Sequence, residues 1–119
     1  MSIVSIEVRR AEPSDAQAIS DAHSTSWRQA YTGVLPYKSL DTMVRRRDSV
    51  WWERAIRQST RILVLDVGGV IAGYATLGPN RVRNLPYQGE IYELYLAPEY
   101  QGLGFGKRLF LAARRELKS

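Results

Sequence analysis

The chain has 119 residues, of which 45% are hydrophobic and 24% charged, as expected for a single soluble domain. It contains no cysteine, which excludes disulfides and thiolate metal sites and fits an intracellular location, so we expect a cytoplasmic protein without a metal site. The net charge of +5 favours polyanionic partners. No array of aromatic and basic residues accompanies that charge, so we expect no nucleic-acid binding, and no apolar run or secretory signal predicts a membrane or secreted protein.

The first predicted elements are a strand and a helix. Residues 3–9 mix apolar residues with alternation, which is typical of a strand. Ser14 and Gln17 have the spacing of a capping box, which predicts a helix that begins at Ser14 and runs to about Tyr31, with Gly33 as its stop. The buried stripe expected on this helix consists of Ala18, Ala22, Trp27, Ala30 and Tyr31.

A second helical region is predicted over residues 35–58, where apolar residues recur near helical spacing. Asp41 or Asp48 either interrupts this helix or caps a second segment. Three further strands are expected at residues 61–67, 70–77 and 90–97, the first two joined by a hairpin turn at Gly68-Gly69, and a last helix from about Gly104 to the end. The prediction is a single α/β domain over residues 1–119, with a mixed, mostly antiparallel sheet flanked by helices in the order β-α-α-β-β-β-α.

Between the last strand and the last helix, residues 101–107 read QGLGFGK. The spacing of Gly102, Gly104 and Gly106 fits neither a mononucleotide P-loop nor the dinucleotide fingerprint G-x-G-x-x-G. A glycine turn that leads from a strand into a helix N-terminus nevertheless directs backbone N–H groups toward one point, where phosphate binds well. The alternative is a plain strand-to-helix turn that needs glycine only for its geometry.

The surrounding residues favour the phosphate site. Gln101, Gly104 and Gly106 form Q-x-x-G-x-G directly after a strand, which resembles the acetyl-CoA-binding motif of the GCN5-related N-acetyltransferase (GNAT) family. The segment HSTSWRQAYTGVLP at residues 23–36 looks like the first helix and following loop of many such enzymes, and the hairpin at residues 61–77 matches their second and third strands. The resemblance extends over nearly the whole chain.

This resemblance implies an acetyl-CoA site beside the fourth strand. The pyrophosphate is expected on the backbone N–H groups of residues 102–107, and the pantetheine arm is expected to pair with the backbone of the fourth strand like an added strand. The cofactor-binding residues expected from the resemblance are Leu94, Tyr95, Leu96, Gln101, Gly102, Leu103, Gly104, Phe105, Gly106 and Lys107.

The implied reaction is direct acetyl transfer from acetyl-CoA to a primary amine of a small-molecule or peptide acceptor. The amine must lose a proton, for which Glu93 is the first choice as base and Glu90 the second. Their odd spacing places them on opposite faces of a regular strand, unless a bulge, frequent in this strand of the family, changes that. Trp27 and Tyr31 are expected to line the acceptor site, although Trp27 is equally explained as core.

His23, the single histidine, either shuttles protons or is a structural residue of the first helix. Family members continue after the last helix with a fifth strand, a helix that often supplies a tyrosine acid, and further strands. We therefore expect an incomplete domain whose fourth strand is a free edge, with a homodimer or a strand-swapped partner as its completion. The rival hypotheses are a chain that binds CoA without turnover and an electrostatic nucleic-acid binder.

Overall fold

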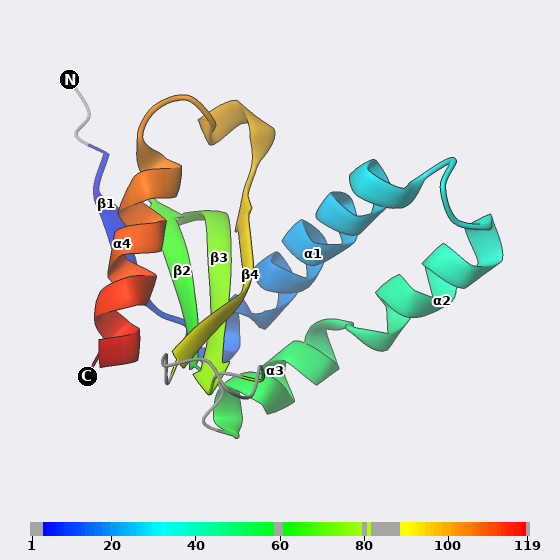
Figure 1. Cartoon of the computed structure of the whole chain (residues 1–119), viewed down its shortest axis with the longest axis horizontal. Helices are drawn as coiled ribbons and strands as arrows, with labels where there is room; N and C mark the ends of the chain where they lie inside the picture. Colours follow the sequence, from blue (N-terminus) through cyan, green and yellow to red (C-terminus); the bar gives the residue numbers. More distant parts are fainter. Residues whose placement is uncertain (1–3, 59–60, 80, 82–88, 119) are drawn as a thin grey trace.

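The computed structural model describes residues 4–58, 61–79, 81 and 89–118. In chain order its elements are β1 (Ile6–Arg10), a 3-10 turn (Pro13–Asp15), α1 (Ala16–Tyr31), α2 (Tyr37–Arg46), α3 (Ser49–Arg57), β2 (Arg61–Val67), β3 (Val70–Pro79), β4 (Gly89–Leu96), a second 3-10 turn (Pro98–Tyr100) and α4 (Phe105–Lys118). The strands form one antiparallel sheet in the order β1-β2-β3-β4 (Figure 1). The predicted α/β fold with a mostly antiparallel sheet is confirmed, and the predicted second helical region consists of two helices.

Helices cover both faces of the sheet. Because side chains alternate along a strand, β2 sends Ile62 and Val64 to one face and Leu63 to the other. The first face packs against α1 and α3 through Ile19 and Trp52. The core on the other face is Leu63, Ala75 and Leu77 of the sheet with Leu109 and Ala113 of α4. The helix α2 lies away from the sheet, at the end of the molecule farthest from α4 (Figure 1).

No helix within the described ranges combines the length and apolarity that a bilayer crossing needs. The structure consists of a single chain, so the homodimer or strand-swapped partner stays a prediction. The cytoplasmic location also stays a prediction. Within the described residues β4 pairs only with β3, so it is the edge strand that the sequence analysis expected.

The start of α1 differs from the prediction. The predicted capping box of Ser14 and Gln17 is wrong, because the box is formed two residues earlier, by Glu12 and Asp15. The Asp15 carboxylate accepts the Glu12 backbone N–H at 2.7 Å. Pro13 explains the earlier start, since its fixed φ and missing N–H suit the first helical position. Gln17 instead donates to Asp21 one turn further along, at 2.9 Å.

The buried stripe of α1 is also corrected. Its fully buried residues are Ala16, Ile19 and His23, whereas Ala30 and Tyr31 of the predicted stripe are exposed. The C-terminal half of α1 extends beyond the edge of the sheet (Figure 1), and the end of the helix is exposed. The buried residues of α1 thus lie in its N-terminal half, and His23 is one of them.

An ion-pair network joins β1, the start of α1 and β2. The Arg9 guanidinium contacts Asp15 at 2.7 Å and Asp66 at 3.1 Å. The hydrogen bond from Arg9, together with that from the Glu12 backbone N–H, lowers the pKa of Asp15 below its usual value. Asp15 is buried, so this ion pair is screened less than one at the surface.

We expect the Asp15→Asn variant to lose about 1–3 kcal/mol of stability at about pH 7. A carboxylate whose pKa is lowered by folding stabilises the fold above its unfolded pKa, and this contribution is lost as the pH falls through the folded pKa. The stability difference between Asp15→Asn and the unmodified chain should therefore shrink as the pH falls through the folded pKa of Asp15, which lies below its usual value. Urea unfolding at about pH 7 and at successively lower pH values measures it, with the exposed Glu7→Gln as control.

The helix α3 begins at a conventional cap. Asp48 is its N-cap residue, and its side chain accepts the Trp51 backbone N–H at 2.9 Å. We expect Asp48→Ala to destabilise the chain by about 1 kcal/mol and Asp48→Asn to cost much less, because asparagine also caps. Equal losses in thermal unfolding of the two variants would show that this cap contributes nothing.

Candidate functional site

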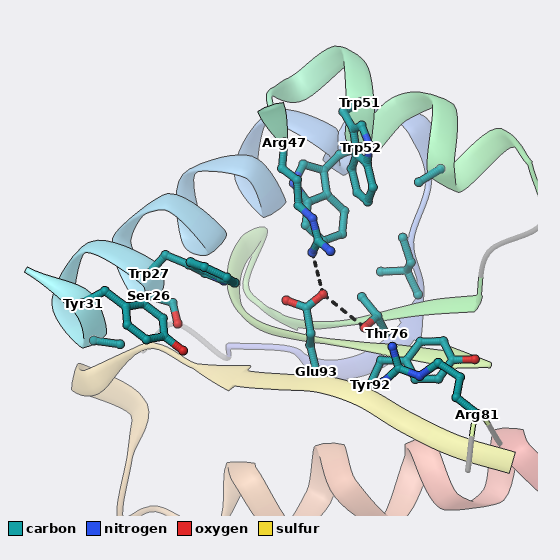
Figure 2. A pocket seen from close by; sticks show the side chains of 13 residues that line it. Ser26, Trp27, Tyr31, Arg47, Trp51, Trp52, Thr76, Arg81, Tyr92 and Glu93 are labelled. Atoms are coloured by element: carbon teal, nitrogen blue, oxygen red, sulfur yellow. Dashed lines mark hydrogen bonds and ion pairs between the residues drawn. The ribbon is translucent and has the colours of Figure 1, made fainter. Parts of the chain in front are cut away.

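A cavity of about 410 Å³ lies between α1, α3 and the strands β3 and β4. Its size is within the range of small-molecule sites. Five aromatic side chains line it: Trp27, Tyr31, Trp51, Trp52 and Tyr92. Figure 2 shows them around the carboxylate of Glu93, and we call this space the Glu93 cavity. The three tryptophans are all those that the sequence contains.

Glu93 projects from the middle of β4 into this cavity (Figure 2). Its Oε1 accepts a hydrogen bond from Arg47 at 2.7 Å, and its Oε2 accepts one from the Tyr74 hydroxyl at 3.3 Å. Thr76, opposite Glu93 on β3, donates to Oε1 at 3.5 Å. Burial and the Glu93 charge raise the pKa of Tyr74, so its hydroxyl stays protonated and remains a donor. Glu93 is thus a held and oriented carboxylate.

A bulge in β4 places both glutamates on one face of the sheet. Glu93 pairs with Thr76, whereas the next β3 residue pairs with Ile91, so Tyr92 is the extra residue. Glu90 then lies opposite Gly78, two residues along β3 from Thr76 and therefore on the same face.

Glu90 is engaged elsewhere. Its carboxylate accepts the backbone N–H of Arg81 at 3.0 Å and the guanidinium at 2.6 Å, and this pairing lowers the pKa of Glu90. The same guanidinium lies 3.8 Å from the ring centre of Tyr92, which forms part of the cavity wall. Glu90 therefore positions Arg81 against Tyr92 in the cavity wall, whereas the Glu90 carboxylate itself does not line the cavity.

Arg47 is a charged residue of the cavity that the sequence did not predict. It follows α2 directly, and its backbone carbonyl accepts the Ser20 hydroxyl at 3.2 Å. Its guanidinium lies 4.7 Å from the ring centre of Trp51 and 5.7 Å from that of Trp52, besides pairing with Glu93. In the sequence Arg47 is the last of three consecutive arginines, and such runs usually lie on the solvent-exposed surface, so nothing marked it as a cavity residue.

Trp27 and Tyr31 lie together on α1, with ring centres 5.0 Å apart, and both line the Glu93 cavity. Trp27 is partly buried and Tyr31 is exposed, so neither belongs to the fully buried core. Their position fits the predicted acceptor site, although their role stays a prediction.

The glycine turn has free backbone donors. Within the described residues, the N–H groups of residues 102–107 have no hydrogen-bond acceptor, whereas the Arg108 N–H donates to the Gly104 carbonyl at 3.2 Å. Gly102 and Gly104 have φ of 81° and 83°, a conformation that other residues rarely adopt. These donors surround the N-terminus of α4, where the helix dipole is positive. The chemistry of the turn fits an anion such as a pyrophosphate.

Side chains fix this turn next to β4. The Gln101 amide donates to the Leu96 carbonyl at 3.0 Å, which ties the turn to the end of the strand. Arg108 donates to the Ile6 carbonyl at 2.9 Å and holds α4 to β1, so it serves the fold, while Lys107 is exposed. Leu103 is 65% exposed and Phe105 packs against Tyr100, with ring centres 6.2 Å apart.

The remaining predicted cofactor residues lie on β4. Leu94 is 41% exposed, whereas Tyr95 is half-buried against Tyr74. Leu96 packs next to Gly106, because a Cβ added to this glycine would lie 3.7 Å from the Leu96 side chain. The free edge of β4 in the described chain leaves its backbone accessible, which the predicted pairing with a pantetheine arm requires. That pairing stays a prediction.

The sequence model of the acetyltransferase (GNAT) family matches residues 18–119. The chain therefore belongs to the GNAT family, as its motif indicated. It is 30% identical over 105 residues to the uncharacterized N-acetyltransferase YuaI of Bacillus subtilis, covering 87% of this chain and 60% of YuaI. It is 25% identical over 117 residues to spermidine N(1)-acetyltransferase of Thermoplasma acidophilum, covering 97% of this chain and 72% of that enzyme.

Solved structures show the same fold. PaiA N-acetyltransferase from Thermoplasma acidophilum, in complex with coenzyme A, superposes with a TM-score of 0.77 at 24% identity, covering 96% of this chain and 72% of that one. YncA from Salmonella typhimurium, with acetyl-CoA, gives a TM-score of 0.65 at 22% identity, covering 96% and 64%. The chain thus spans between three fifths and three quarters of the lengths of these relatives.

Proposed function

We propose that this protein is an acetyl-CoA-dependent N-acetyltransferase that transfers the acetyl group directly to a primary amine. The observation that carries the proposal is the layout of β4. Its middle presents Glu93 to an aromatic cavity, and its end leads into a turn with free backbone N–H groups. One strand thus joins a site for an amine to a site for a pyrophosphate. The two relatives that are solved with coenzyme A or acetyl-CoA support the choice of co-substrate.

The glycine turn would hold the co-substrate by its pyrophosphate. Backbone N–H groups of residues 102–107 donate to the phosphate oxygens, and Lys107 adds a positive charge at the surface. Leu94, Tyr95 and Leu96 would present the free β4 edge to the pantetheine arm. In this arrangement the thioester would lie near the bulge at Tyr92, and a backbone N–H of β4 would donate to its carbonyl oxygen.

Glu93 would accept the proton that the amine must lose before it attacks, either directly or through a water molecule. The amine nitrogen bonds to the thioester carbon, the carbon–sulfur bond breaks, and the CoA thiolate leaves and takes up the second proton that the nitrogen loses as the amide forms. Arg47 occupies Oε1 of Glu93 in the free chain, so the amine has to displace its guanidinium. The aromatic walls stabilise the ammonium form on arrival by cation–π contacts.

The second candidate is a chain that binds CoA without turnover. The ion pair between Arg47 and Glu93 favours it, because the Arg47 guanidinium occupies Oε1, where the acceptor amine would otherwise bind. The two candidates share the glycine turn and differ only in what happens at Glu93. A binding measurement therefore gives the same result for both, and a turnover measurement separates them.

Release of the CoA thiol tests the proposed function. The chain contains no cysteine, so a thiol reagent detects only the product. Acetyl-CoA is mixed with the protein and with a panel of amines that includes spermidine, the substrate named for the Thermoplasma relative. We expect amine-dependent thiol release with at least one member and a mass increase of one acetyl group on that amine. Binding of acetyl-CoA with no thiol release across the panel would favour the second candidate.

A further inference from the structure

A second cavity of about 330 Å³ adjoins the first. It is lined by His23, Trp27, Met43, Arg46, Arg47 and Trp51, and we call it the His23 cavity. Trp27, Arg47 and Trp51 also line the Glu93 cavity, so the two spaces are neighbours that share these side chains. The Arg47 side chain lines both cavities, and its guanidinium is held by Glu93.

His23 is an unpaired polar group at this second cavity. Its side chain is 2% exposed, and neither ring nitrogen has a hydrogen-bond partner among the described residues. Burial, followed by the charge of Arg47, lowers the pKa of His23, so the ring is neutral near pH 7 and carries one donor and one acceptor. Leaving both unsatisfied in the interior is unfavourable, and a polar group in the cavity would satisfy at least one of them.

The charged side chains that line the His23 cavity are both positive. They are Arg46 and Arg47, and no carboxylate of the described residues lines the cavity, although the charge of Glu93 next to it acts on His23. Arg46 forms no ion pair within the described part of the chain, and the partner of Arg47 lies in the neighbouring cavity. A cationic group would meet two guanidinium groups here, whereas a carboxylate would find two charge-assisted donors and the imidazole N–H.

We propose that the acceptor is a zwitterion, whose amine lies at Glu93 and whose carboxylate enters the His23 cavity between Arg46, Arg47 and His23. The proposal rests on the proposed function and names its substrate class. The free chain pairs Arg47 with Glu93 internally. A zwitterion replaces both halves of this pair: its ammonium takes over Glu93, and its carboxylate takes over Arg47. A diamine would satisfy Glu93 but leave Arg47 unpaired beside Arg46.

Three amines with the same five-carbon chain test this: δ-aminovalerate, pentylamine and cadaverine, which carry a carboxylate, a methyl group and a second amine at the far end. Intrinsic fluorescence reports their binding, because all three tryptophans line the Glu93 cavity. We expect δ-aminovalerate to bind about tenfold more tightly than either of the others. Tighter binding of cadaverine than of δ-aminovalerate, or no fluorescence change with any of the three at millimolar concentration, would overturn the proposal.

Two variants locate the effect. Arg46→Gln should remove most of the preference for δ-aminovalerate over pentylamine, whereas Arg45→Gln should retain it, because Arg45 pairs with Asp41 and lines neither cavity. Equal preferences in the two variants would count against the proposal. His23→Phe should weaken δ-aminovalerate binding about threefold to tenfold and leave pentylamine binding unchanged. Because His23 is buried, circular dichroism first establishes whether the His23→Phe variant is folded. If this variant is unfolded, the Arg46→Gln result decides.

The binding test is independent of turnover. If thiol release fails while δ-aminovalerate keeps its preference, acetyl transfer is wrong and the zwitterion site stands. If thiol release occurs but cadaverine binds best, the proposed function stands and the zwitterion site is wrong.

Discussion

Replacing Gly104 with aspartate is expected to weaken acetyl-CoA binding by at least about 100-fold. A carboxylate at this position would stand before the free N–H groups of the turn and repel the pyrophosphate that they would bind. A Cβ at Gly104 meets no atom within 4 Å, so the cost of the change is backbone strain at positive φ, which aspartate bears better than most residues. Calorimetric titration of the variant with acetyl-CoA measures the loss, and its thermal unfolding confirms that it is folded.

The matched control is Gly104→Asn, which has the same shape and the same tolerance of positive φ but no charge. We expect it to bind acetyl-CoA more weakly than the unmodified chain and clearly more tightly than Gly104→Asp. If aspartate and asparagine weaken binding equally, the loss is steric, and the argument from the helix dipole fails. If neither weakens it, acetyl-CoA is not held by this turn.

The Glu93→Gln variant is expected to lower the turnover number about 100-fold to 10,000-fold, the usual contribution of a general base. Glutamine keeps the size of the side chain and one oxygen that can accept from Arg47, and its amide N–H can donate to the Tyr74 hydroxyl oxygen, but it cannot take a proton from the amine. Acetyl-CoA binding should stay within about twofold, since the pyrophosphate turn lies beyond the end of β4. Thiol release gives the turnover number, and calorimetry gives the dissociation constant.

Glu90→Gln is the control for this prediction. Glu90 lies on the same face of β4 but pairs with Arg81, so its loss should lower turnover by less than about tenfold. A Glu90→Gln variant as slow as Glu93→Gln would transfer the role of base to Glu90. A Glu93→Gln variant with normal turnover would show that the acceptor loses its proton to another group.

The strands and the glycine turn were predictable because local chemistry determines them. The bounds of β2 agree with the predicted residues 61–67, since β-branched and aliphatic residues end there at Gly68-Gly69. A turn at Gly102 and Gly104 was predictable because glycine is unfavourable in regular structure, and both residues have positive φ.

The composition of the Glu93 cavity was less predictable, because it depends on tertiary contacts. Arg47 reaches Glu93 only because the chain breaks between α2 and α3, and 46 residues separate the two side chains. His23 is buried because α1 begins after Pro13 and turns a different stripe toward the sheet. A bulge, by contrast, is the condition under which the sequence brings Glu90 and Glu93 to one face, and the register of β3 with β4 shows that bulge at Tyr92.

Calorimetric titration of acetyl-CoA into the unmodified 119-residue chain tests the cofactor site most directly. The free N–H groups of residues 102–107 predict saturable binding of one acetyl-CoA per chain, with desacetyl CoA binding nearly as well because the pyrophosphate is common to both. Circular dichroism of the same sample establishes that the chain is folded. A folded chain that binds neither molecule at millimolar concentration would contradict the site and the acetyl transfer that depends on it.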